Sequence, residues 1–325
     1  MFVTMQRALG LLCTVVCATA GAQGANDYPS RPVTIVVLST AGSAQDGAMR
    51  AIGARMAERL KQPVVIDNRV GASGIIGVDH VAKSAPDGYT LVAMNNTMVI
   101  LPALRKDLPF DVNRDFAHVA KLANLRMALA VSNNLKTPNL NALFAEVKAN
   151  PGKYTFASPG VGSPHHMGGE LIKQNLSLDM RHIPHKDQTL ALQSLGGGHV
   201  DIMVGGLSTL LVLGNTGKAT VLGTTGDTRT NNAPGVPTFK EAGYGFVDSV
   251  SSWIVISAPA RTPQAIVARL NRDFNAVLVL PEIKAALAKV DADPDIGTPE
   301  QTAALVQTGL DQWKRVVTQA GIKIE

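Results

Sequence analysis

The stretch VTIVVLSTAGSAQDGAMRAIGARMAERL, at Val33–Leu60, decides the fold. Its apolar start, Val33–Leu38, predicts a buried strand, and the polar loop STAGSAQD follows it. Apolar residues then recur at helical spacing, at Met49, Ile52, Met56 and Leu60. A strand that runs through a Gly/Ser loop into an amphipathic helix is one corner of an α/β sheet.

A second corner of the same kind opens the later half of the chain. The strand YTFAS at Tyr154–Ser158 leads through PGVGSPH into a helix with Met167, Leu171 and Ile172 on one face. The first N–H groups of a helix have no partner within the helix, so each corner can bind a carboxylate or phosphate. Two such corners predict a ligand held between two lobes.

Strands and helices alternate along most of the chain, which is typical of α/β units on a parallel sheet. The expected strands are Val33–Leu38, Val64–Asn68, Thr90–Met94, Arg126–Val131, Tyr154–Ser158, Met180–Pro184, Val200–Val204, Val221–Thr225 and Ser251–Ser257. The expected helices are Gly47–Leu60, Ile75–Lys83, Asn139–Ala149, His165–Asn175, Thr189–Leu195, Pro263–Val279 and Pro299–Gln319. We expect residues 27–124 and 229–325 to form one lobe and residues 125–228 the other, with a ligand cleft beyond the carboxyl ends of the strands.

Residues Met1–Ala22 predict an export signal, with Arg7 before an apolar core at Leu11–Ala20. Both cysteines, Cys13 and Cys17, lie inside it, so we expect no disulfide and no cysteine metal site in the mature chain. No apolar run is long enough to predict a membrane-spanning helix. The formal net charge of +5 is scattered, which argues against a nucleic-acid partner.

Several longer motifs resemble one family of proteins. They are YPSRPVTIVV at Tyr28–Val37, VIDNRVGASGIIG at Val65–Gly77, KSAPDGYTL at Lys83–Leu91, ASPGVGSPHHMGGEL at Ala157–Leu171, HIPHKDQTLALQSLGGGHVDIM at His182–Met203 and VPTFKEAGY at Val236–Tyr244. The family is the Bug family, the periplasmic solute-binding receptors of tripartite tricarboxylate transporters.

The resemblance implies a two-lobed type II periplasmic binding (Venus-flytrap) fold with a mainly parallel sheet in each lobe. It further implies a monomer in the periplasm that closes on a small carboxylate, without metal or cofactor, and delivers it to the membrane components of a transporter. Main-chain N–H groups, hydroxyls and bridging waters would hold the carboxylate.

The first corner departs from the family pattern Pro-Phe-x-Pro/Ala-Gly-Gly-Gly-Thr-Asp. Its candidate ligand-binding residues are Thr40, Gly42, Ser43, Gln45 and Asp46. The alternative is a structural role in which Asp46 caps the helix. Because the loop has lost glycines and gained Ser43, we expect a ligand preference of its own.

The second corner keeps the family pattern Ser-x-Gly-x-Gly-Ser-x-x-His. Its candidate residues are Ser158, Gly160, Gly162, Ser163 and His166. A glycine loop with two hydroxyls brings several donors to one carboxylate, although His166 alternatively only caps or packs.

Two further segments supply candidates. On the second lobe these are His185, Lys186 and Asp187, where Asp187 alternatively caps the next helix; on the first lobe they are Asn95, Asn96 and Thr97.

Three other interpretations are weaker. His165, His166, His182 and His185 lie close together, but their spacing does not fit a tetrahedral metal site. Ser163 and His166 could act as nucleophile and base of a hydrolase, but the chain lacks a G-x-S-x-G elbow. A sensor that docks on a signalling partner remains an alternative to a transport receptor.

Overall fold

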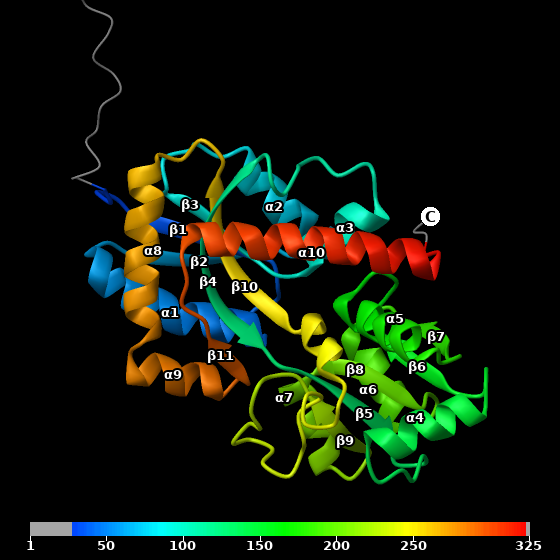
Figure 1. Ribbon diagram of the computed structural model, residues 1–325. Coiled ribbons are helices and arrows are strands. Elements are labelled where there is room, and N and C mark those ends of the chain that lie inside the picture. The colour runs from blue at the N-terminus through cyan, green and yellow to red at the C-terminus, as the bar shows by residue number, and fades with distance from the viewer. Residues whose placement is uncertain (1–27, 323–325) are drawn as a thin grey trace, which may run out of the picture.

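The computed structural model describes residues 28–322, which form two α/β lobes, each built around its own sheet (Figure 1). This confirms the predicted two-lobed α/β architecture. The predicted export signal, with Cys13 and Cys17, lies outside the described residues. Among residues 28–322, no helix is long and apolar enough to cross a membrane.

The first lobe contains a six-stranded sheet of order β11-β4-β10-β3-β1-β2. Its strands are β1 (Val33–Val37), β2 (Val64–Asn68), β3 (Thr90–Met94), β4 (Phe116–Leu125), β10 (Ser252–Pro259) and β11 (Ala292–Pro294). β1 pairs in parallel with β2 and β3, whereas β10 and β4 are antiparallel to their neighbours. The sheet is therefore parallel where the corners form and antiparallel where the chain crosses to the other lobe.

Helices cover both faces of this sheet. They are α1 (Ala44–Leu60), α2 (Ile75–Ala82), α3 (Thr97–Leu104), α8 (Gln264–Leu278), α9 (Pro281–Ala288) and α10 (Pro299–Ala320). Ile35 of β1 packs in a core with α1, α8 and α9, while the adjacent Val36 packs in a second core with α2, α3 and α10. Since successive strand residues point to opposite faces, an apolar run such as VTIVV can be buried on both sides.

The second lobe contains a five-stranded sheet of order β7-β6-β8-β5-β9. Its elements are β5 (Met127–Ser132), α4 (Leu140–Ala149), β6 (Thr155–Ser158), α5 (Pro164–Leu176), β7 (Arg181–Pro184), α6 (Gln188–Gly196), β8 (Ile202–Gly206), α7 (Leu207–Asn215) and β9 (Ala219–Thr224). β6 pairs in parallel with β7 and β8, and β5 is antiparallel to β8 and β9. Both sheets are therefore mixed, where a mainly parallel sheet was expected in each lobe, because the strands that cross between the lobes, β4, β5 and β10, run antiparallel to their neighbours.

The chain passes between the two sheets twice. β4 ends at Leu125 and β5 begins at Met127; the return runs from β9 through the 3₁₀ helix η2 (Gly245–Val250) into β10. At the first crossing, Arg126 is buried and donates two hydrogen bonds to the carboxylate of Asp293 in β11, at 2.7 and 3.0 Å. The limits predicted for the lobes, 27–124 with 229–325 and 125–228, remain a prediction of where the domains divide.

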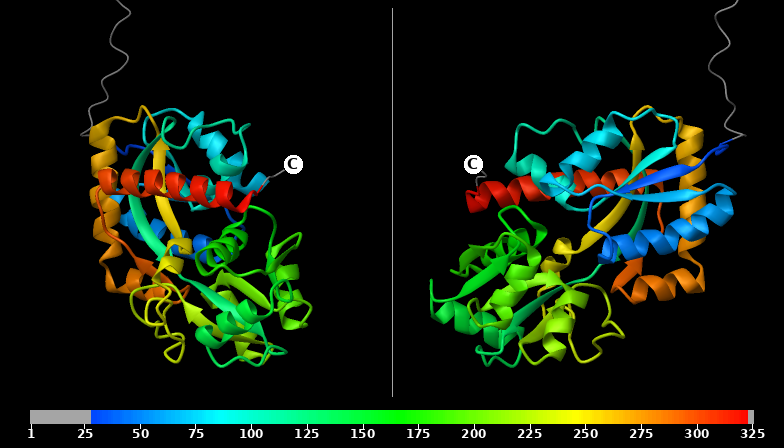
Figure 2. Two further views of the ribbon diagram at one scale, coloured as in Figure 1. Left: turned by 45° about the vertical axis from the view of Figure 1, so that its right-hand side comes forward. Right: turned by 180° about the vertical axis from the view of Figure 1, so that it is seen from behind.

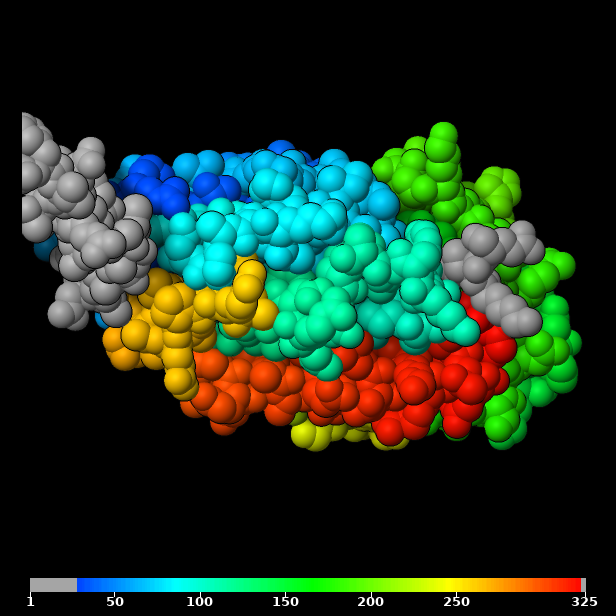
Figure 3. All heavy atoms as spheres, turned by 90° about the horizontal axis from the view of Figure 1, so that it is seen from above, coloured from blue at the N-terminus to red at the C-terminus, as the bar shows by residue number. Residues whose placement is uncertain are grey.

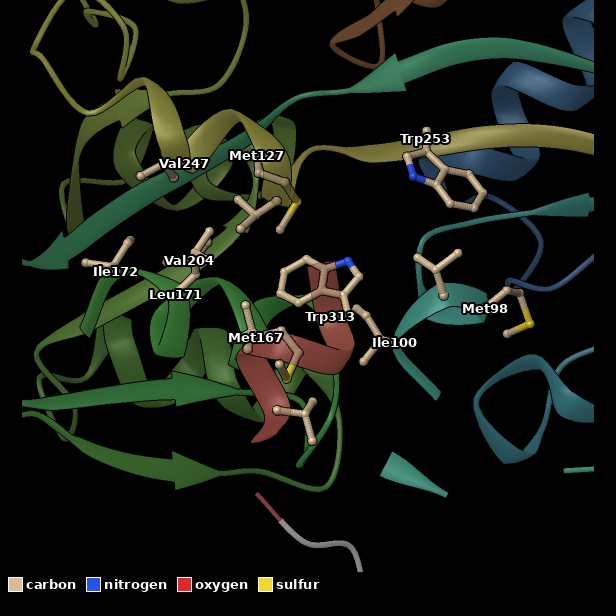
Figure 4. Close-up of a cluster of buried hydrophobic side chains, with 14 of the residues drawn as sticks. Met98, Ile100, Met127, Met167, Leu171, Ile172, Val204, Val247, Trp253 and Trp313 are labelled. Carbon is tan, nitrogen blue, oxygen red and sulfur yellow. The ribbon is translucent and has the colours of Figure 1, made fainter. Parts of the chain in front are cut away.

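The long helix α10 makes a third connection between the lobes. It packs along α3 and β4 and also contacts α5 of the second lobe, and the rotated views show its carboxyl end lying over that lobe (Figure 2). Seen from above, it lies beside the segment that contains α3 (Figure 3). Trp313 of α10 lies among Ile100, Met127 and Met167 in one hydrophobic cluster that includes residues of both lobes (Figure 4).

Candidate functional site

A cavity of about 400 Å³ lies between the two lobes. Its lining residues are Leu38, Gly71, Ala72, Ser73, Gly74, Ile75, Asn95, Thr97, Leu101, Arg105, Pro159, Val161, Gly162, Ser163 and Pro164. Its size falls in the range of about 300–1,000 Å³ that is usual for small-molecule sites. The lining comes from loops that follow β1, β2, β3 and β6, so the cavity lies beyond the carboxyl ends of parallel strands.

Four of the residues predicted to bind ligand line this cavity. They are Asn95, Thr97, Gly162 and Ser163. The first two follow β3 and begin α3, and the other two lead from β6 into α5. The structure thus brings one predicted segment of each lobe to the same cavity.

The second corner is held in shape by its own hydroxyl groups. Ser158 Oγ donates to the carbonyl of Gly160 at 2.9 Å, and Ser163 Oγ donates to the same carbonyl at 2.8 Å. Ser163 also caps α5, since its Oγ accepts the N–H of His166 at 3.2 Å. Gly160 has a φ of 127°, which side chains other than glycine's hydrogen rarely allow.

His166 is hydrogen-bonded to the second corner but does not line the cavity. Its Nδ1 accepts the N–H of Gly162 at 3.0 Å, and its ring stacks on that of His182 with 3.8 Å between centroids. His182 in turn is hydrogen-bonded to Ser158 Oγ at 2.7 Å. Burial lowers the pKa of His166 to about 4 and that of His182 to about 3, so both rings are neutral at pH 7.

Some main-chain donors at the cavity have no hydrogen-bond acceptor among the described residues. The N–H groups of Val161, Ala72 and Ser73 are of this kind. Since unpaired N–H groups in a concave site attract anions, the cavity offers donors from both lobes to an anionic group.

The loop Gly71–Gly74 also lines the cavity, although none of its residues is among those predicted to bind ligand. All four of its residues have positive φ, including Ala72 at 46° and Ser73 at 57°. For Ala72 and Ser73, which are not glycines, this conformation costs of order 1–3 kcal/mol each, and such strain is concentrated at functional sites. The pattern was visible in the sequence, because β2, the loop and α2 repeat the plan of the two corners.

In the first corner, the buried carboxylate forms its hydrogen bonds within the protein and does not line the cavity. The buried carboxylate of Asp46 accepts hydrogen bonds from Gly42 N at 2.8 Å, Arg50 Nε at 2.9 Å and Asn68 Nδ2 at 2.9 Å. The hydrogen bond from Arg50, followed by those from Gly42 and Asn68, lowers the pKa of Asp46 to about 2. Only Leu38 of this corner lines the cavity.

The Asp46→Asn substitution is expected to lower the free energy of unfolding by about 2 kcal/mol at pH 7, because the variant loses charge-assisted hydrogen bonds in a buried position. Urea denaturation of the purified protein measures this. Glu58→Gln on the same helix, α1, is the control: Glu58 is paired with Arg55 at the exposed surface, and its loss should change stability by less than about 0.5 kcal/mol. Equal effects of the two substitutions would contradict the interpretation.

The other candidates of the first lobe lie beside the cavity or point away from it. Ser43 caps α1 and is hydrogen-bonded to Ser39, and Gln45 is buried and donates to the carbonyl of Ala93. Thr40 and Gly42 lie in the exposed part of the loop. Asn96 is buried and is hydrogen-bonded to Ser251 and Ser252, at the start of β10.

The candidates of the third loop do not line the cavity either. Asp187 caps α6 by accepting the N–H of Leu190 at 2.9 Å, as the alternative interpretation has it. His185 Nδ1 lies 3.0 Å from the carbonyl of Ile183, and Lys186 is exposed. A role of these residues in ligand binding remains a prediction.

The geometry does not join Ser163 and His166 as a nucleophile and a base. The Ser163 hydroxyl donates to Gly160, and the Nδ1 of His166 accepts from Gly162. Hydrolysis would need a hydrogen bond between the two side chains. Within residues 28–322 there is also no group of three or more His, Cys, Asp or Glu side chains that could hold a metal ion.

Comparison with known proteins gives one consistent result. A family described as "Tripartite tricarboxylate transporter family receptor" matches residues 48–322. The protein BugT of Bordetella pertussis is 33% identical over 317 residues, which are 96% of this chain and 97% of BugT.

Solved structures show the same likeness. Rpa4515 of R. palustris, solved with adipate, is 30% identical with a TM-score of 0.79, over 91% of this chain and 99% of its own. MatC of Rhodopseudomonas palustris, solved with bound malate, is 30% identical with a TM-score of 0.74, over 89% of this chain and all of its own. The periplasmic binding protein BugD is 28% identical with a TM-score of 0.76, over 92% of this chain and all of its own.

Proposed function

The chain belongs to the family of tripartite tricarboxylate transporter receptors, and from this premise we propose that it captures a small carboxylate between its lobes and delivers it to the membrane components of such a transporter. Proteins of this family work in the periplasm, and the solved relatives are binding proteins. As a receptor, the protein would act as a monomer, without metal or cofactor.

The observation that carries this proposal is the composition of the interlobe cavity. It is lined by main-chain donors and small polar side chains of both lobes, by one arginine and by no carboxylate. An anionic ligand therefore meets donors and no carboxylate among the lining residues, and water can bridge the remaining distances at little cost.

The distribution of donors over both lobes also explains how a ligand would favour closure of the two lobes around it. Val161 lies on the second lobe, whereas Ala72 and Ser73 lie on the first. A ligand that accepts hydrogen bonds from both sets stabilises the arrangement in which the lobes are close, and only such differential binding can shift the equilibrium toward it.

Adipate and malate are the first probes, because structural relatives were solved with them. We expect one or both, or another di- or tricarboxylate, to raise the melting temperature of the purified protein. A ligand at 100 times its dissociation constant adds about 2.7 kcal/mol to the free energy of unfolding. If no carboxylate in such a screen changes the melting temperature, the proposal is wrong.

The Ser163→Ala variant tests whether the second corner is the seat of the carboxylate. It removes the cap of α5 and one of the two hydroxyls that hold the Gly160 carbonyl, so we expect the affinity for the carboxylate to fall about tenfold. Isothermal titration calorimetry measures the affinity.

Asn139→Ala is the matched control. Asn139 caps α4 through the N–H of Ala142 and does not line the cavity. Both variants should lose about 1 kcal/mol of stability, but Asn139→Ala should keep the affinity of the wild type. An unchanged affinity in Ser163→Ala would place the carboxylate elsewhere.

A further inference from the structure

Arg105 is the one residue with a charged side chain among those that line the cavity in the described part of the chain. It follows directly after α3, and its side chain is 38% exposed. The guanidinium is charged at every physiological pH, so it is a permanent hydrogen-bond donor at this end of the cavity.

Arg105 lies at the carboxyl end of α3, whereas Asn95 and Thr97 line the cavity at the amino end of the same helix. Thr97, Leu101 and Arg105 follow each other at intervals of four residues, and all three line the cavity. Thr97 and Leu101 share one face of the helix. Arg105 is the residue at which the chain leaves the helix, and its N–H is still bonded to the carbonyl of Leu101 at 2.9 Å. Eight residues of helix rise about 12 Å, so the cavity extends along α3 from Thr97 to Arg105.

One edge of the Arg105 guanidinium is held by Asp107. Nε donates to Asp107 Oδ1 at 3.0 Å and Nη2 donates to Oδ2 at 2.8 Å. None of the described residues accepts a hydrogen bond from Nη1. The pair with Asp107 thus orients the guanidinium and leaves its other edge, formed by Nη1 and Nη2, for a second carboxylate.

We infer that Arg105 determines specificity by binding a second carboxylate of the ligand, so that this receptor selects dicarboxylates over monocarboxylates of the same length. The inference rests on the proposed function, in which the first carboxylate is bound at the second corner. The cavity lining also includes the apolar side chains of Leu38, Leu101 and Val161, which suits an apolar chain between the two carboxylates.

The experiment compares α,ω-dicarboxylates of four to eight carbons, adipate included, with monocarboxylates of the same lengths, by calorimetry on the full mature chain. We expect the best dicarboxylate to bind at least tenfold more tightly than its matched monocarboxylate. Arg105→Gln should weaken dicarboxylate binding about 10- to 100-fold and leave monocarboxylate binding unchanged. Arg105→Lys keeps the charge but not the flat pair of donors. Its affinity for the dicarboxylate should therefore lie between that of the wild type and that of Arg105→Gln.

Arg114→Gln is the matched control. Arg114 also binds its neighbour, Asp115, through Nε and Nη2, but it is 74% exposed and does not line the cavity. This variant should bind both ligand classes as the wild type does. The melting temperature of each variant shows whether it is folded. If Arg105→Gln does not fold, Arg105→Lys is used to test the role of Arg105.

The outcomes separate the two proposals. If monocarboxylates bind as tightly as dicarboxylates, or if neither Arg105 variant weakens dicarboxylate binding, the role of Arg105 is refuted and carboxylate capture stands. If neither class of acid binds the wild type, nor any tricarboxylate, carboxylate capture itself is refuted, and the role of Arg105 with it.

Discussion

Replacing Trp313 by alanine is expected to lower the free energy of unfolding by about 3 to 5 kcal/mol. Trp313 lies in α10, is only 2% exposed and belongs to the hydrophobic cluster that contains residues of both lobes. Truncation leaves a cavity at the place where α10, α3 and the second lobe meet (Figure 4). The loss therefore affects the contact between lobes as well as the first lobe's own core.

Urea denaturation at pH 7 measures this effect. Trp313→Phe keeps most of the buried volume and should lose less than half as much stability as Trp313→Ala. Val212→Ala is the control for removing apolar atoms at the surface, because Val212 is 67% exposed; it should change stability by less than about 0.5 kcal/mol. A loss below 1 kcal/mol in Trp313→Ala would show that α10 does not join the lobes energetically.

Nine of the eleven strands that the structure describes were predicted, because most of them are short apolar runs bounded by turn residues. The strands β4 and β11 were not predicted, since β4 mixes polar with apolar residues and β11 has only three residues. β2 and β3 begin and end where they were expected, and the two corners lie at the carboxyl ends of β1 and β6. The resemblance to a receptor family is confirmed by the matched family and by the solved relatives.

The helices α7 and α9 were not predicted, and neither was α3, which contributes Thr97 and Leu101 to the cavity lining and places Asn95 and Arg105 at its two ends. The sequence of α3, TMVILPAL, is apolar throughout, so it has no amphipathic period, and Pro102 argues locally against a helix. Met98 and Ile100 are fully buried between the sheet and α10, which stabilises the helix through tertiary contacts that no local pattern records. Arg105, placed by this helix, was missed for the same reason.

The direction of polar side chains was the least predictable feature. Asp46 and Asn96 both lie next to loops at the cavity, yet each turns into the protein to meet partners distant in the sequence, Asn68 and Ser252 respectively. Residue type and spacing indicate that a loop has polar groups, but not which of these groups form hydrogen bonds within the protein. The main-chain N–H of Val161, by contrast, has no acceptor among the described residues.

Replacing His166 tests whether a neutral imidazole keeps the second corner in its binding conformation. The Nδ1 of His166 accepts the N–H of Gly162, which is possible only while that nitrogen is unprotonated. We expect His166→Ala to lose about 3 kcal/mol of stability, since it removes a stacked, buried ring and leaves the Gly162 N–H without its acceptor. His166→Asn offers an oxygen near the position of Nδ1 and should bind the carboxylate more tightly than His166→Ala.

The same arrangement predicts how the protein responds to acid. An unfolded chain protonates this histidine near pH 6.5, whereas burial lowers the pKa of His166 in the folded state to about 4. Between these two values the unfolded state binds a proton that the folded state does not, so stability falls as the pH drops through this window and is unaffected above it. The loss from His166 alone is about 3 kcal/mol between pH 7 and pH 4.

Urea denaturation at pH 7, 6, 5 and 4 separates this effect from the others. His118, His165 and His182 also have pKa values lowered by burial and will add to the acid loss of the wild type. His166→Asn has no group to titrate at this position, so its stability should fall less steeply with pH than that of the wild type. His80→Asn changes an exposed histidine of α2 and should keep the wild-type slope. If His166→Asn and the wild type lose the same stability between pH 7 and pH 4, the neutral ring of His166 does not hold the corner, and its contact with Gly162 is incidental.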